Sequence, residues 1–255
     1  MALAEDRARA VIRRLQALAG GADVTRKAAA RALSELAPTE AIELLHEVQR
    51  LSREGWLPAC EVLPAFTRAL EREAADIPHF EDLRRVATLH EQADVELLFA
   101  QGQPSREYNA DAAARADAKL FNMPLGYLKQ QARLTKNPDE LARLAVASNP
   151  TVVREVLKNA RLTEAVVVRI AARRPARPEP LTEIWASARW CQRPAVRRAL
   201  VLNPYLPPEV GTKIVPLLSR AELAEVAEDS GLHLSLRQQA QVLLADEEEK
   251  EEERR

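Results

Sequence analysis

The spacing of apolar residues along the first hundred positions predicts a series of amphipathic helices. Apolar side chains recur three and four positions apart, which is the period of an α-helix. The stretches with this spacing cover residues 5–18, 23–36, 39–54, 57–75 and 80–99. Asp23 or Thr25 is suited to cap the second helix, Thr39 to cap the third, and Gly55 to close it. The pattern therefore predicts an N-terminal helical bundle over residues 1–100.

A change of pattern at residues 101–107 marks the end of this bundle. The segment lacks large apolar residues and contains both glycine and proline, which is typical of a linker. Two further helices are predicted beyond it, over residues 111–121 and 125–134, with Pro124 between them.

The second half of the chain repeats itself at an offset of about 44 residues. Residues of the same type recur at this offset over two successive predicted helices. The matched pairs are Pro150 and Pro194, Val152 and Val196, Arg154 and Arg198, Asn159 and Asn203, Leu162 and Leu206, Val166 and Val210, and Ile170 and Ile214. Self-similarity with a period of about 20–50 residues is typical of stacked repeats, in which each unit buries its apolar face against its neighbours.

The turn chemistry explains why the repeated unit consists of short helices. Asn203 tolerates the conformation that ends a helix, and Pro204 cannot continue it. Pro207-Pro208-Glu209 then favours a new helix, because proline suits the first turn and an acidic side chain stabilises that end of the helix dipole. The unit is accordingly expected to be a helix, a tight proline turn and a second helix.

These motifs resemble those of leucine-rich-repeat-variant and HEAT-like helical repeat proteins. The resemblance rests on Val153-Arg154, on Asn159-Ala-Arg-Leu-Thr, on Ile170-Ala171 and on Asn203-Pro-Tyr-Leu-Pro-Pro, and it covers about residues 128–244. It implies a short right-handed α-solenoid, which we assign to residues 108–245, and an extended interaction surface without general catalytic residues. The inserted Arg174-Pro-Ala-Arg-Pro-Glu-Pro departs from the family pattern.

Composition supports an all-α fold. The apolar fraction is 47%, but aromatic residues supply only 4%, and the apolar residues are mostly alanine, leucine and valine. Strands favour β-branched and aromatic residues, so this balance suits closely packed helices better than a sheet. The Ala- and Arg-rich composition also suggests a bacterial source.

The location expected for the protein is the cytoplasm. Charged residues occupy the positions where the apolar region of a signal peptide would lie, and no run of about eighteen apolar residues occurs. Cys60 and Cys191 lack metal-binding or redox spacing, which favours free thiols in a reducing compartment. Cys60 is expected in the core, whereas Cys191 has the alternative of a modifiable thiol near Arg189.

No pattern of residues predicts catalysis or a cofactor. The four histidines are scattered at positions 46, 79, 90 and 233, without the spacing of a zinc motif. Glu43 and His46 have the Glu-x-x-His spacing of di-iron bundles, but those need a second such motif. Nucleophile elbows and Gly-rich phosphate loops are also missing from the sequence. We expect a non-enzyme with no metal, cofactor or catalytic residue.

Arginines concentrate between positions 154 and 198, together with Trp185 and Trp190. Trp185 aligns with Leu141, which predicts a place in the core. The residues predicted to contact a partner are Arg154, Arg189, Trp190, Arg193, Arg197, Arg198 and Tyr205, called the arginine surface below.

Three interpretations of the arginine surface remain open at the level of sequence. The arginines form internal ion pairs with Glu155, Glu164 or Glu183, or bind an acidic protein partner, or bind the phosphates of a nucleic acid. The tail, residues 246–255, is mostly acidic and is expected to be disordered or a fraying helix end, with a docking role as the alternative. The predicted function is a protein-interaction scaffold or regulatory adaptor, with a nucleic-acid-binding HEAT-like protein as the alternative.

Overall fold

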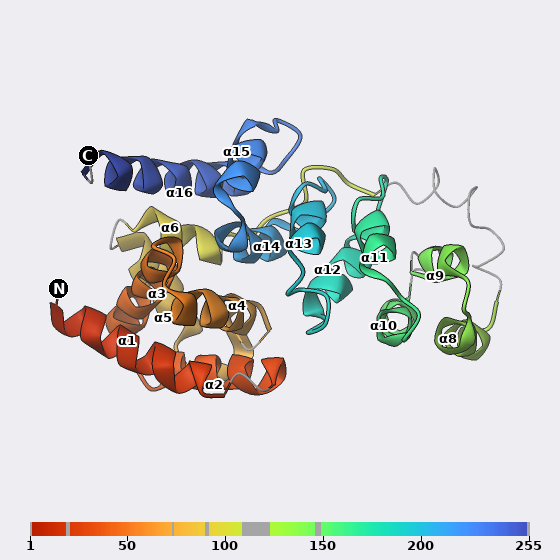
Figure 1. Ribbon diagram of the computed structural model, residues 1–255, viewed down its shortest axis with the longest axis horizontal. Coiled ribbons are helices and arrows are strands. Elements are labelled where there is room, and N and C mark those ends of the chain that lie inside the picture. The colour runs from red at the N-terminus through yellow and green to blue at the C-terminus, as the bar shows by residue number, and fades with distance from the viewer. Residues whose placement is uncertain are drawn as a thin grey trace. The chain divides into compact units, whose positions relative to one another are not determined.

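The computed structural model describes residues 2–18, 21–72, 74–89, 92–108, 123–145 and 149–253. Within these ranges every regular element is an α-helix or a short 3-10 helix, as the sequence predicts (Figure 1). The helix expected over residues 111–121 lies outside the described residues. None of the described helices combines the length and the apolar character needed to cross a lipid bilayer.

The chain divides into two compact units. Unit 1 consists of Met1–Gln101, Thr212–Glu228 and Leu234–Arg255, and unit 2 consists of Gly102–Gly211 and Asp229–His233. This division differs from the expected one, because most of the chain after Gly211 clusters with the N-terminal helices instead of continuing the second half.

The N-terminal helices of unit 1 are α1 (Ala2–Gln16), α2 (Ala22–Ser34), α3 (Pro38–Arg53) and α4 (Leu57–Arg72). The helix α4 packs against α1, α2 and α3, and α1 also packs against α3. Gly55 follows α3 with φ of 80°, which confirms its predicted role as the residue that closes this helix. The side chains at the centre of this bundle are fully or almost fully buried: Ile12, Leu33, Ile42, Leu45, Leu63 and Phe66.

The predicted N-caps of α2 and α3 are wrong by a few residues. Gly21 and Ala37 occupy the N-cap positions, so Asp23, Thr25 and Thr39 lie inside the first turns. The hydroxyl of Thr25 instead donates hydrogen bonds to the backbone oxygens of Leu18 and Gly21. The predicted capping residues lie two to four positions after the observed N-caps, and the apolar spacing of the helix is the same for either start. Periodicity alone therefore does not fix where a helix begins.

The helix expected over residues 80–99 is interrupted. In its place lie α5 (Phe80–Leu89), α6 (Ala93–Glu96) and the 3-10 helix η2 (Leu97–Phe99), preceded by η1 (Ala74–Asp76). Gln92, just before α6, has φ of −89° and ψ of 82°, which lies outside the helical region. Both parts keep helical spacing, so the apolar pattern did not reveal the break.

The C-terminal helices of unit 1 follow α14 (Pro208–Ile214) and η3 (Val215–Leu217); they are α15 (Arg220–Glu228) and α16 (Leu234–Glu253). The helix α16 packs along α15 and also contacts α6 and η3. Leu217 packs against the core of the N-terminal helices. These contacts explain why this segment belongs to unit 1.

The charged tail, for which we expected disorder or a fraying helix end, is helical through Glu253 as part of α16. Glutamate and lysine are good helix formers, so a run of these residues extends a helix that is already in place. An ion pair holds the first residue of this tail, because Arg53 of α3 lies 3.1 Å from the carboxylate of Asp246.

Unit 2 contains six described helices before α14. They are α8 (Leu125–Leu134), α9 (Pro138–Leu144), α10 (Pro150–Lys158), α11 (Glu164–Ala171), α12 (Pro178–Ala186) and α13 (Pro194–Val201). Each packs mainly against the second next helix along the chain: α8 against α10 and α10 against α12, and likewise α9 against α11 and α11 against α13 (Figure 1). The offset of about 44 residues therefore spans three helices, since it carries α10 onto α13, and not the two that the sequence suggested.

Proline starts four of the unit 2 helices, α9, α10, α12 and α13. Asn137 and Asn149 cap two of them, because each side-chain oxygen accepts a hydrogen bond of 2.9 Å from the backbone N–H two residues later. Trp185 and Leu141 are both fully buried, which confirms the predicted core position of this tryptophan.

Candidate functional site

Arginine–carboxylate pairs join the helices of unit 2 that lie side by side. Between α8 and α10, Arg133 Nε lies 2.5 Å from Glu155 Oε2. Between α10 and α12, Arg154 donates two hydrogen bonds of 2.7 and 2.6 Å to the two carboxylate oxygens of Glu183. The hydrogen bond from Arg133 also lowers the pKa of the Glu155 carboxyl.

The same arrangement joins α9, α11 and α13. Arg169 of α11 lies 2.9 Å from Asp139 of α9, and Arg193, at the start of α13, lies 3.9 Å from Glu164 of α11. The expectation of an internal pairing between Arg154 and Glu183 is thus confirmed. Because the arginine of each pair is more than half exposed, each pair stabilises the fold by at most about 1 kcal/mol.

A second set of bridges satisfies the backbone oxygens at the helix ends. Asn159, which follows α10, donates to the backbone oxygens of Ala132, Arg133 and Thr135 at the end of α8, at 2.8 to 3.2 Å. Its side-chain oxygen accepts a hydrogen bond of 2.8 Å from the N–H of Arg161. The last carbonyl groups of a helix have no partner within the helix, so this buried amide stabilises both segments.

Asn203 makes the same contacts after α13. Its amide donates to the backbone oxygens of Ala171 and Arg173 at the end of α11, at 2.7 and 3.0 Å, and its oxygen accepts from the N–H of Tyr205. Both asparagines are buried. The sequence match between Asn159 and Asn203 therefore reflects a shared structural role.

Trp190 is only 2% exposed, which corrects its prediction as a residue that contacts a partner. Its Nε1 donates a hydrogen bond of 3.0 Å to the backbone oxygen of Leu157 at the end of α10. Arg189 lies over the indole ring, 4.3 Å from its centroid, and also donates to the backbone oxygens of Asn159 and Leu162. Trp190 thus serves as a support beneath Arg189.

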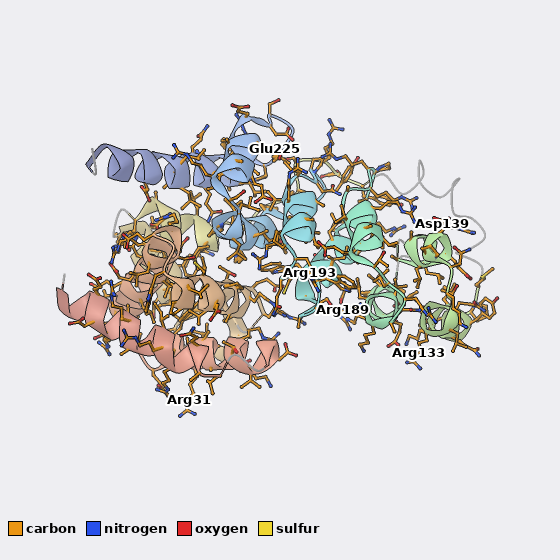
Figure 2. The ribbon with its side chains drawn as sticks, viewed as in Figure 1. Arg31, Arg133, Asp139, Arg189, Arg193 and Glu225 are labelled. Carbon is orange, nitrogen blue, oxygen red and sulfur yellow. The ribbon has the colours of Figure 1, made fainter. Side chains whose placement is uncertain are left out.

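The other residues of the arginine surface differ in exposure. Arg154, Arg189, Arg193 and Arg198 are exposed, whereas Arg197 and Tyr205 are half-buried. Arg197 donates a hydrogen bond of 2.7 Å to the backbone oxygen of Cys191, whose side chain is buried. Figure 2 shows Arg189 and Arg193 near each other beside α12, with Arg133 on α8 farther along unit 2.

Arg161 is a further exposed cation of this region. Its side chain forms no ion pair among the described residues of unit 2, although its backbone is held by Asn159. Arg161 belongs to the arginine cluster of the sequence, but local spacing does not show which of these arginines has an acidic neighbour in space, so the sequence did not single it out.

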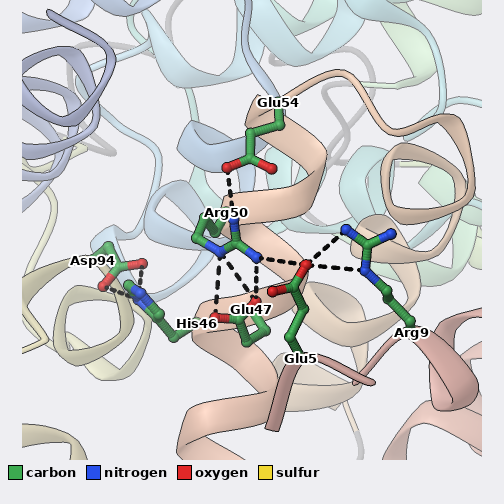
Figure 3. A network of polar contacts seen from close by, with 7 residues as sticks. All are labelled: Glu5, Arg9, His46, Glu47, Arg50, Glu54 and Asp94. Carbon is green, nitrogen blue, oxygen red and sulfur yellow. Dashed lines mark hydrogen bonds and ion pairs between the residues drawn. The ribbon is translucent and has the colours of Figure 1, made fainter. Parts of the chain in front are cut away.

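Unit 1 contains a polar network that the sequence did not reveal (Figure 3). Arg50 of α3 lies 2.7 Å from Glu47, 2.6 Å from Glu54 and 3.5 Å from Glu5 of α1. Arg9 pairs with Glu5 at 2.7 Å. The carboxylate of Glu5 thus links the two arginines, and the hydrogen bond from Arg9 lowers the pKa of this carboxyl group.

His46 of α3 forms the second part of the network with Asp94 of α6. Its Nδ1 lies 3.2 and 3.1 Å from the two oxygens of Asp94, which is 3% exposed. This hydrogen bond raises the pKa of His46, and burial opposes the shift. Gln49 and Arg53 also approach the same carboxylate, at 3.4 and 3.8 Å.

Glu43 and His46 have the Glu-x-x-His spacing, but no further ligands join them to form a metal site among the described residues. Across the part of the chain that the structure describes, no three histidine, cysteine or acidic side chains converge to hold a metal ion. His46 instead binds Asp94, which lies 48 positions farther along the chain.

Comparisons with known proteins do not place the chain in a family. No family model matches it, and no curated protein or solved structure is significantly similar to it.

Proposed function

We propose that the protein is a non-catalytic interaction scaffold or regulatory adaptor, in which unit 2 forms a short right-handed HEAT-like solenoid. The observation that carries the proposal is the repeated bridging in unit 2. The helices α8, α9, α10 and α11 are each tied to the second next helix by an arginine–carboxylate pair. Three of these four neighbouring pairs of helices are also tied through the backbone oxygens at a helix end. Stacks in which each element contacts only its neighbours provide extended, semi-rigid binding surfaces.

The partner that suits this surface is a protein with exposed carboxylates. Arg154 and Arg193 remain 53% and 56% exposed although they are paired, and Arg161 is exposed without an ion pair among the described side chains. An exposed pair contributes little stability, so a partner carboxylate replaces an internal one at a small cost. Such charges fix the orientation of the partner and speed association.

A reducing, cytoplasmic location also belongs to this proposal. It is supported by Cys60 and Cys191, which are both free thiols. The thiol of Cys60 donates a hydrogen bond to the backbone oxygen of Ser52, and Cys191 is buried.

The test is a pull-down with the full-length tagged protein from a lysate of its source cells, with and without nuclease. The captured partner is then purified, and its affinity is measured over a series of salt concentrations. Replacing Arg161 and Arg193 together by glutamate is expected to weaken binding by about tenfold or more, because two cations become repulsive anions. These two positions are preferred to Arg189, which supports the fold through its backbone contacts.

The matched control is Arg84→Glu in α5 of unit 1, an exposed arginine with one loose pair at 3.7 Å to Glu81. This variant is expected to bind the partner as the parent protein does. Equal binding by all variants would remove the arginine surface from the proposal. Loss of all captured material after nuclease treatment, with affinity falling by about one log unit per log salt for each phosphate contacted, would favour a nucleic-acid-binding function instead.

A further inference from the structure

A groove with an apolar floor lies between α1 and α2 of unit 1. Its volume is about 440 Å³. The α1 side is lined by Val11, Leu15 and Leu18, and the α2 side by Ala28, Ala32 and Leu36. Leu18 is 40% exposed, and Val11, Ala28 and Leu36 are only partly buried against the core. The floor therefore leaves apolar surface in contact with water, which is unfavourable until something covers it.

Cations dominate the rim of this groove. Arg7 and Arg14 line it from α1, and Arg31 and Glu35 line it from α2. Arg31 lies 2.7 Å from Glu35 and projects from α2 toward solvent (Figure 2), and Arg7 pairs with Glu40 of α3.

Arg14 differs from the other two arginines of the rim. It is exposed and forms no ion pair or side-chain hydrogen bond among the described residues of unit 1. The rim thus offers one uncompensated positive charge above the apolar floor, where a negative charge on a bound molecule is favoured.

We propose that this groove binds an acidic amphipathic helix of a partner protein. The α1 lining runs from Arg7 to Leu18, which is about 16 Å at the rise of a helix and corresponds to three turns. A helix that lies in such a groove places apolar side chains at positions i, i+3 or i+4, and i+7 into the floor. Its flanking acidic residues then face Arg14 and the outer parts of Arg7 and Arg31.

Charge complementarity selects this occupant over a basic or uncharged helix. A basic helix would bring its lysines against the arginines of the rim, and like charges at such an interface are strongly unfavourable. The groove is lined by residues of unit 1 alone. Peptide binding there can therefore be refuted without affecting the function proposed for unit 2, and the reverse also holds.

The experiment uses the full-length protein and a fluorescein-labelled synthetic helix of about eighteen residues, long enough to form a helix when bound. The peptide carries leucines at i, i+3, i+4 and i+7 and glutamates on both flanks. Binding is followed by fluorescence anisotropy. Arg14→Glu is expected to weaken binding by about tenfold, because the free cation of the rim becomes an anion. Arg13→Glu, next to it on α1 and also exposed but not among the residues that line the groove, is expected to change affinity by less than about twofold.

A second variant tests the floor. Ala32→Leu adds apolar volume inside the groove and is expected to block the peptide, while thermal unfolding followed by circular dichroism confirms that the helices are retained. The control peptides are a scrambled sequence of the same composition and a version with lysine in place of glutamate, and neither is expected to bind.

Several results would overturn the proposal. They are equal weakening by Arg13→Glu and Arg14→Glu, equal binding of the scrambled peptide, and no peptide binding up to about 1 mM. Binding of dodecanoate without binding of the peptide would identify the groove as a site for a small amphiphile and would also overturn it.

Discussion

His46 Nδ1 lies 3.1 Å from Asp94 Oδ2, and this contact joins α3 to α6 across 48 positions of the chain. The hydrogen bond to Asp94 raises the pKa of His46 above its usual value of 6.5. Glu47 also favours the charged imidazole, whereas burial and Arg53 oppose it. Protonated His46 thus stabilises the folded state more than neutral His46 does.

This pair predicts a stability that falls as pH rises. The contribution of His46 is fully present below pH 6.5 and is lost as pH rises through the folded-state pKa. Because the side chain is partly exposed, we expect a loss of about 1 kcal/mol in the free energy of unfolding. Urea titrations between about pH 5 and pH 9 measure this, with His46→Gln as the control whose profile lacks the step. Identical profiles for the two proteins would contradict the role given to the pair.

Replacing Asn159 tests the bridges at the helix ends. Asn159→Ala leaves three backbone oxygens without their donor, so we expect a loss of about 1–3 kcal/mol in the free energy of unfolding. Asn159→Asp is expected to cost more, because an isosteric carboxylate has no N–H to donate and repels these oxygens. Chemical denaturation of the full-length variants gives both values.

The control for this prediction is Asn149→Ala, which removes a half-buried local cap at the start of α10, where Asn149 accepts hydrogen bonds from the N–H and the hydroxyl of Thr151. Its cost should be about 1 kcal/mol and therefore smaller. Equal costs at the two positions would show that the bridge to α8 adds nothing beyond a local cap.

The pair of Arg154 and Glu183 is expected to contribute little stability despite its two short hydrogen bonds. A double-mutant cycle with Arg154→Ala and Glu183→Ala should give a coupling energy of at most about 1 kcal/mol, since Arg154 is 53% exposed. Added salt should reduce the coupling further. A coupling well above this value would mean that the pair resists displacement by a partner, which would weaken the function proposed for unit 2.

Comparing Trp190 with Trp185 measures how much the hydrogen bond from Trp190 to Leu157 contributes to the free energy of unfolding. Trp190→Phe removes the donor to the backbone oxygen of Leu157, whereas the buried Nε1 of Trp185 has no hydrogen-bond partner among the described residues. Both substitutions remove the same volume from a buried site, but only the first breaks a bond. We expect Trp190→Phe to cost about 1 kcal/mol more than Trp185→Phe in denaturant unfolding. The opposite order would contradict the assigned role of Trp190.

The sequence predicted much of the helical structure because its signals are local. The helix Leu125–Leu134 was predicted with its observed bounds, and Pro208, predicted to open a new helix, begins α14. The match between Asn159 and Asn203 pointed to equivalent positions before their shared contacts were known. In each case residues a few positions apart determine the outcome.

The candidate sites were predicted less well, because they depend on residues far apart in the chain. Trp190 lies in the irregular turn between α12 and α13, where no periodicity shows which side chains face inward. Asp94 follows the break between α5 and α6, and the apolar spacing did not predict this break. The groove between α1 and α2 likewise depends on how two helices pack, and neither helix predicts it alone.

The bridging of each unit 2 helix to its second next neighbour has a consequence for how this part of the chain unfolds. Among the described elements, α10 and α11 are bridged on both sides, whereas α8, α9, α12 and α13 have a bridged neighbour on one side only. Opening can therefore begin at an outer helix of this series and proceed one helix at a time. Amide hydrogens should exchange with deuterium faster in α8 and α9 than in α10 and α11, so that the stack opens from the outside inward instead of melting in one step.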